Sequence, residues 1–210
     1  MHFKDELDAV LAKHRGLVYH LDNNSLSGEL FLPDGDSYEV QIKLDRYPEL
    51  FPIVLETGGR IPNKMYRHIY TDTGSCCFTT AAKSQILLKT TIRSLLLFID
   101  EIVIRYFENN SYYEINGAYS FEEYDHGSKG VVQSYQDVLG ITDVKSIAKL
   151  IVQRLNNDKL RIRDLCYCKS GNTLKKCCNG KHSIYYRQFR MIDKRILTND
   201  LHHFSKVLGL

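Results

Sequence analysis

The sequence predicts an α+β fold, and three features of its first half support this class. Residues 3–14 place apolar side chains at helical spacing. Three apolar runs then follow at 26–32, 38–44 and 53–57, separated by turn-forming residues, as in an antiparallel sheet. Residues 89–107 carry the strongest helical stripe of the chain. A helix, a meander of strands, a long loop and a second helix in this order are typical of an α+β domain.

Turn residues and alternation support the individual elements. The N-terminal helix is expected to end at Gly16. The first strand run stops at Pro33-Asp34-Gly35-Asp36, which favours a turn. The second run, Tyr38-Glu39-Val40-Gln41-Ile42-Lys43-Leu44, alternates polar and apolar residues, so we expect one of its faces to contact solvent. The third run closes at Gly58-Gly59.

The second half of the chain is predicted to be helical around a cysteine-rich turn. Residues 110–130 are rich in Asn, Tyr, Gly and charge, and they predict an ordered loop. The predicted helices occupy residues 131–140, from 142 or 143 to about 155, 183–197 and 200–208.

Charge divides the 210-residue chain into two parts. Residues 1–144 hold 13 Lys and Arg against 21 Asp and Glu, a balance of −8. Residues 145–210 hold 15 against 4, a balance of +11. This length accommodates one full domain and a small second one. We therefore expect two domains, residues 1–140 and 141–210.

No stretch of the sequence predicts a membrane span or a secretory signal. The longest apolar run, residues 94–99, is far shorter than the roughly 20 residues that cross a bilayer. The segment from Met1 to Glu6 is amphipathic and acidic. We expect a cytoplasmic protein whose thiols stay reduced.

All six cysteines fall in two clusters, and the first contains Cys76 and Cys77. The two follow a Gly-Ser turn in an irregular stretch of about 30 residues, and a loop of that length is usually functional. A nearby base or cation activates a thiol, and His68 and Arg67 are candidates. Buried free cysteines also serve as small apolar residues, so a packing role stays open.

These motifs resemble those of ubiquitin-conjugating enzymes. Tyr47-Pro48-Glu49-Leu50-Phe51-Pro52-Ile53-Val54 resembles the Tyr-Pro-x-x-Pro-Pro-x-Val segment that follows the family's antiparallel meander. A histidine and a Gly-Ser-x-Cys-Leu sequence come next in that family, then a crossover helix. Here they correspond to His68, to Gly74-Ser75-Cys76-Cys77-Phe78 and to residues 89–107. The resemblance covers residues 3–107 and implies a ubiquitin-conjugating (UBC-like) fold with Cys77 as the catalytic cysteine.

The chain departs from the eukaryotic pattern in two places. His68-Ile69-Tyr70 stands where those enzymes have His-Pro-Asn, whose asparagine helps to stabilise the oxyanion. The segment between Val54 and His68 is about five residues longer than in those enzymes. This variant resembles bacterial conjugating-like proteins of CBASS antiphage operons, whose cysteine forms a thioester with the C-terminus of a cGAS-like nucleotidyltransferase. The resemblance implies such a thioester on Cys77, with His68 either orienting the loop or acting as a base.

The second cluster, Cys166-x-Cys168-x8-Cys177-Cys178, has the spacing of a structural zinc site. It resembles the SEC-C zinc knuckle, with Tyr167 and Lys169 in place of a proline and a glycine. We expect zinc to be held by Cys166, Cys168, Cys177 and Cys178, with His182 as an alternative fourth ligand. A closed site of this kind has a structural role.

The basic segment around the knuckle allows several partners. Its Lys and Arg side chains could follow nucleic-acid phosphates, contact a protein, or form an ordinary solvated helix face. Nucleic acid is the least expected of these. Our leading hypothesis is an enzyme that holds a partner's C-terminal glycine as a thioester on Cys77. The alternative is a catalytically inactive conjugating-type fold that docks a partner protein through the zinc knuckle.

Overall fold

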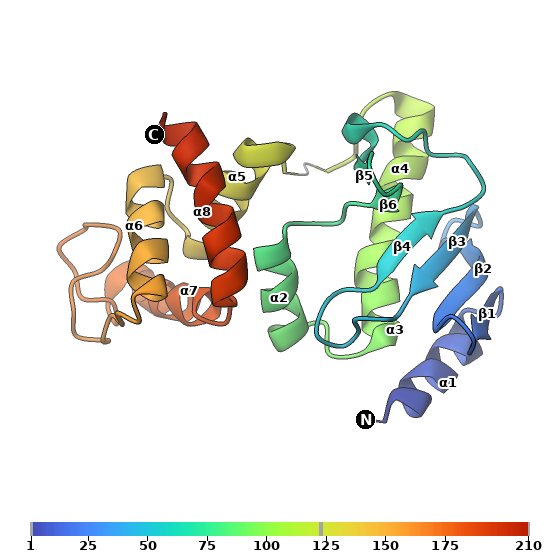
Figure 1. Ribbon diagram of the computed structural model, residues 1–210, viewed down its shortest axis with the longest axis horizontal. Helices are drawn as coiled ribbons and strands as arrows, with labels where there is room; N and C mark the ends of the chain where they lie inside the picture. The colour runs from blue at the N-terminus through green and yellow to red at the C-terminus, as the bar shows by residue number, and fades with distance from the viewer. Residues whose placement is uncertain (1, 122–123, 210) are drawn as a thin grey trace. The chain divides into compact units, whose positions relative to one another are not determined.

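The computed structural model describes residues 2–121 and 124–209, and the chain divides into two compact units (Figure 1). Unit 1 comprises Met1–Phe78 and Leu87–Glu123. Unit 2 comprises Thr79–Ile86 and Tyr124–Leu210. The expected domains, 1–140 and 141–210, were drawn from charge. The units follow packing instead, and the helix α5 (Gly127–Leu139) contributes to the core of unit 2.

Unit 1 contains an antiparallel sheet with the strand order β1-β2-β3-β4-β6-β5. The predicted α+β class and antiparallel sheet are confirmed, and the three predicted strand runs correspond to β2, β3 and β4. The short strand β1 was not predicted. The bounds are Leu17–His20 for β1, Ser25–Phe31 for β2, Ser37–Lys43 for β3, Ile53–Glu56 for β4, Ile69–Tyr70 for β5 and Ser75–Cys76 for β6.

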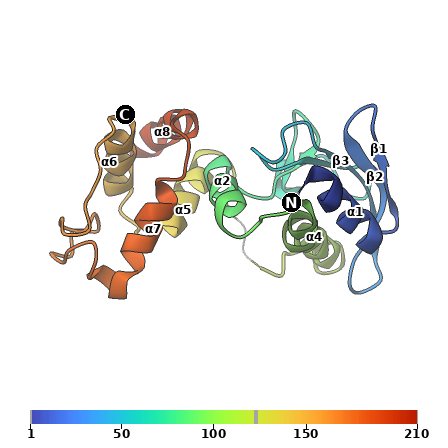
Figure 2. The same cartoon turned by 90° about the horizontal axis from the view of Figure 1, so that it is seen from below.

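Helices pack against one face of this sheet (Figure 2). They are α1 (Phe3–Lys13), α3 (Leu95–Phe98) and α4 (Ile104–Asn116), with a π-helical turn, Ile99–Val103, joining the last two. The inward residues of the strands meet apolar residues of these helices in one continuous core. Its fully buried members include Val10, Leu26, Leu30, Ile42, Val54, Leu95, Phe98, Ile99, Val103 and Phe107.

The long helix predicted for residues 89–107 is displaced towards the C-terminus. It begins after Ser94, whose hydroxyl accepts a hydrogen bond from the Leu97 N–H at 3.2 Å. It ends where Gly117 adopts a left-handed conformation. Residues 110–116 were expected in a loop, but they are helical, and the side chains of Asn110 and Ser111 are buried.

Unit 2 is built from helices and the cysteine-rich turn. The predicted helices are present with shifted bounds: α5, α6 (Val144–Leu155), α7 (Lys181–Phe189) and α8 (Lys194–Leu208). The N-terminal turns of α2 (Ala81–Thr90) also belong to this unit. The two last helices are separated by residues 190–193, and Asp193 occupies the N-cap position of α8. In the core, the buried Tyr135 hydroxyl donates to Asp200 at 2.8 Å.

The described residues include no helix with the length and apolar character of a membrane span.

A buried carboxylate links three segments of unit 1. Glu6 on α1 accepts a hydrogen bond from the Leu95 N–H at 2.7 Å and another from the Tyr47 hydroxyl at 2.5 Å. The first satisfies a backbone donor at the start of α3, which no earlier helical carbonyl can reach. Burial and the carboxylate together raise the pKa of Tyr47, so its hydroxyl remains a donor.

Replacing this carboxylate should destabilise unit 1. We expect Glu6→Ala to lower the free energy of unfolding by about 1–3 kcal/mol, because a buried N–H and a hydroxyl lose their acceptor. The matched control is Asp8→Ala on the exposed side of the same helix, which should change stability by about 0.5 kcal/mol or less. Urea unfolding of both variants measures the difference. Equal effects would show that Glu6 does not link these segments.

Candidate active site and metal centre

The two adjacent cysteines of the first cluster have opposite environments. Cys76 ends β6, pairs with Ile69 on β5 and lies in the core with 6% of its surface exposed. Cys77 follows it and is half-buried. Successive side chains of an extended strand point to opposite faces, which explains why only one thiol enters the core. Burial raises the pKa of Cys76 to about 12, so that thiol stays protonated and unreactive at neutral pH.

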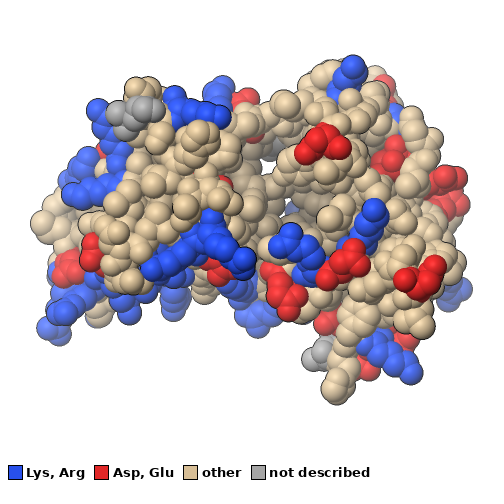
Figure 3. Space-filling view, viewed as in Figure 1, with Lys and Arg blue, Asp and Glu red and all other residues tan. Residues whose placement is uncertain are grey.

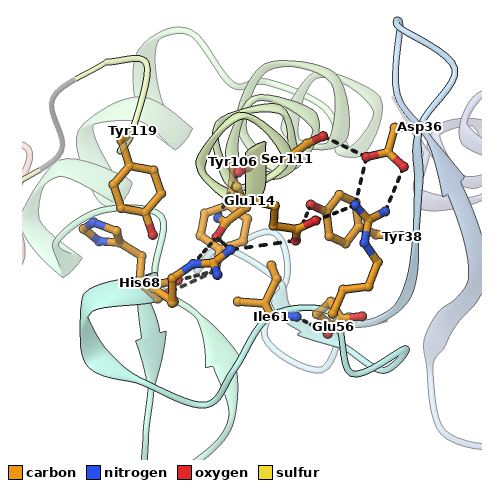
Figure 4. Close-up of polar contacts among 12 residues, drawn as sticks. Asp36, Tyr38, Glu56, Ile61, His68, Tyr106, Ser111, Glu114 and Tyr119 are labelled. Carbon is orange, nitrogen blue, oxygen red and sulfur yellow. Dashed lines mark hydrogen bonds and ion pairs between the residues drawn. The ribbon is translucent and has the colours of Figure 1, made fainter. Parts of the chain in front are cut away.

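His68 supports the backbone next to Cys77. It follows a 3₁₀ turn, Met65–Arg67, in a left-handed conformation with φ 51°. Its carbonyl oxygen accepts the Cys77 N–H at 2.7 Å and the Tyr106 hydroxyl at 3.0 Å. Its buried ring lies edge-on to the ring of Tyr119, with centroids 5.2 Å apart (Figure 4). This geometry agrees with an orienting role for His68 and leaves its role as a base a prediction.

Arg67 is the other expected activator of the thiol, and its side chain contacts α4. Its buried guanidinium donates to the Asn110 side chain at 3.0 Å and lies over the Tyr113 ring at 4.5 Å. Its backbone carbonyl accepts from the Tyr106 hydroxyl at 3.2 Å. Because these partners all lie on α4, Arg67 attaches the loop to that helix.

Arg60 anchors the segment between β4 and His68, which is longer than in the eukaryotic ubiquitin-conjugating enzymes. Its guanidinium forms ion pairs with Asp36 at 2.8 Å and Glu114 at 2.7 Å, and it lies 4.0 Å from the centre of the Tyr38 ring. Figure 4 shows these acidic side chains converging from the turn after β2 and from α4. The hydrogen bond from Arg60 holds the pKa of Asp36 well below its usual range.

Four metal-binding side chains of unit 2 lie together. The ligand atoms of Cys166, Cys168, Cys177 and His182 are all within 4.8 Å of one another. The Cys166 Sγ lies 3.2 Å from the His182 Nδ1, and the Cys168 Sγ lies 3.3 Å from the Cys177 Sγ. Three thiols and one imidazole are a donor set that suits tetrahedral zinc.

Local backbone structure assembles this group. The Cys166 N–H donates to the Asn172 carbonyl at 2.8 Å and closes the turn between the first and second pairs of cysteines. Tyr167 lies parallel to the His182 ring, with centroids 5.0 Å apart, and its hydroxyl donates to the Leu139 carbonyl at 2.8 Å. The residues therefore fit a metal ion that links the turn to α7, and Tyr167 joins the same turn to α5.

Cys178 was expected as the fourth ligand, and the structure places His182 there instead. Cys178 is exposed, and its backbone has a left-handed φ of 48°. Its Sγ stays 3.8 Å from the Cys177 Sγ but is outside the group of four. α7 begins directly after Gly180 and turns the buried His182 towards the thiols. The spacing of the cysteines alone did not distinguish these two ligands.

Comparisons with protein-family models, with curated proteins and with solved structures find no match for this chain. The function is therefore argued from the two sites.

Substitutions should separate the two possible fourth ligands. We expect His182→Ala to lose bound zinc and Cys178→Ser to retain it, because only the first removes a member of the four-donor group. Elemental analysis of the purified variants gives the zinc content. The absorption spectrum of the cobalt-substituted protein adds a count of thiolate ligands, which should be unchanged in Cys178→Ser. Retention in His182→Ala with loss in Cys178→Ser would restore the all-cysteine site.

Proposed function

We propose that this protein is a ubiquitin-conjugating-like enzyme of the type found in bacterial CBASS operons, and that Cys77 carries the C-terminus of a partner protein as a thioester. The observation that carries the proposal is the contrast between the two adjacent thiols. Cys76 is sealed in the core, whereas Cys77 is half-buried at the end of β6, where a substrate can approach it. The antiparallel sheet packed on helices is consistent with a UBC-like fold.

The reaction joins the Cys77 sulfur to the carbonyl carbon of an activated C-terminal acyl group. The thiol gives its proton to solvent or to a base, and the thiolate attacks the carbonyl. The bond to the leaving group then breaks, and that group departs with its electron pair. The expected partner is a cGAS-like nucleotidyltransferase ending in glycine, and the acyl group is that glycine in activated form.

A covalent adduct tests this function directly. When the protein is co-expressed with a nucleotidyltransferase of this class, we expect a mass-shifted species on non-reducing gels that dithiothreitol removes. Cys77→Ala should abolish the adduct, because the nucleophile is absent. Cys77→Ser should convert it into an oxygen ester that resists dithiothreitol.

Cys76→Ala is the matched control, since it removes the neighbouring thiol from the core and should leave the adduct in place. An adduct that persists in Cys77→Ala and disappears in Cys76→Ala would contradict the assignment. The absence of any adduct in the wild type would contradict the enzymatic function.

The second candidate function is a binding module without activity. It is favoured by the second compact unit, which carries the metal-binding group and a basic surface. In Figure 3, Lys and Arg side chains gather over this unit, at the left of the view. Such a module would retain its partner non-covalently in Cys77→Ala, and disruption of the metal group would release it.

A further inference from the structure

The strand pair that carries Cys77 brings a tyrosine to the same face. β5 and β6 are antiparallel, with Tyr70 opposite Ser75 and Ile69 opposite Cys76. Side chains two residues apart on a strand share a face, so Cys77 lies on the face of Ser75 and of its partner Tyr70. Diagonal neighbours in such a pair are within reach of an aromatic side chain. Ile69 and Cys76 lie on the opposite, buried face.

The rest of the hairpin holds this arrangement in place. The Cys77 N–H donates to the His68 carbonyl at 2.7 Å, which extends the pairing by one step beyond β6. At the turn, the Gly74 N–H donates to the Tyr70 carbonyl at 2.7 Å. Both ends of the Tyr70–Cys77 pair are thereby fixed by backbone hydrogen bonds, while Tyr70 as a residue remains 48% exposed.

The chemistry of the two groups is complementary. The register of the strand pair brings the Tyr70 hydroxyl and the Cys77 sulfur close enough to influence each other electrostatically. Burial raises the pKa of Tyr70, and the charge and hydrogen bond of the Cys77 thiolate raise it further. The phenol therefore keeps its proton at neutral pH and can donate it in a hydrogen bond to the thiolate. Such bonds to an ionised acceptor are stronger than those between neutral groups.

We propose that Tyr70 is a further catalytic residue of this site. Its hydroxyl donates a hydrogen bond to the Cys77 thiolate and so keeps the sulfur ionised and ready to attack. The donor stabilises the negative sulfur before attack and is released from it as the carbon–sulfur bond forms. The acyl-transfer part of this role rests on the proposed function. The hydrogen bond to the sulfur does not, and it is measurable on the protein alone.

The test compares the reactivity of Cys77 in the wild type and in Tyr70→Phe. Iodoacetamide alkylation of Cys77 is followed by peptide mass spectrometry across a range of pH. We expect the pH midpoint of alkylation to rise by about one unit in Tyr70→Phe, because the thiolate loses a charge-assisted hydrogen bond. Tyr66→Phe is the matched control. Tyr66 is exposed and precedes β5, and loss of its hydroxyl should leave the pH midpoint of alkylation unchanged. Circular dichroism confirms that both variants are folded.

Two outcomes separate this inference from the proposed function. An unchanged alkylation profile in folded Tyr70→Phe overturns the role of Tyr70, even if the wild type forms the thioester adduct. A shifted profile supports the role of Tyr70, even if no adduct is found. Where the adduct forms, Tyr70→Phe should also slow its appearance at neutral pH by about tenfold, and the deficit should shrink at higher pH as the thiol ionises without help.

Discussion

The placement of the candidate nucleophile depends on one backbone carbonyl. The His68 oxygen accepts the Cys77 N–H from one side and the buried Tyr106 hydroxyl from the other. Tyr106 belongs to α4, which packs on the sheet, so these two hydrogen bonds attach the cysteine loop to the core of unit 1. Leaving the Cys77 N–H without an acceptor would cost about 1–3 kcal/mol, whereas the Tyr106 hydroxyl would keep the Arg67 carbonyl as an acceptor. The alternation of Cys76 and Cys77 then follows, because a slip of one residue would exchange the buried and the accessible thiol.

The sequence predicted the parts of the fold whose pattern is local. Apolar runs that end at turn residues identified β2 and β4, alternation identified β3, and apolar spacing identified α1, with small errors at the ends. β1 was missed because its formation depends on a close approach between distant residues. A Cβ atom on Gly16 would lie 2.1 Å from the Glu29 carbonyl oxygen, so only glycine allows the two strands to meet there. A four-residue strand is too short for a periodic pattern to predict this close approach.

The contrast between local sequence pattern and contacts of distant residues also applies to the two sites. The spacing of Cys166, Cys168 and Cys177 was sufficient to predict three members of the group that could hold a metal ion. The fourth depends on backbone conformation: left-handed φ values at Cys178 and Asn179 redirect the chain, and the first turn of α7 brings in His182. The interaction between Tyr70 and Cys77 likewise depends on the register of two short strands, which a single sequence does not specify.

The two cysteine clusters divide the chemistry between the units. A metal held by three thiolates and one imidazole has a complete set of ligands and no open position for a substrate. Its effect on function would therefore pass through folding: His182 and Tyr167 join the turn to α5 and α7, and loss of the metal would loosen that connection. The bond with a partner that we propose would therefore form elsewhere. Within the described residues, two thiols lie outside both the core of unit 1 and the group of four, Cys77 and Cys178, and our proposal assigns the bond to Cys77.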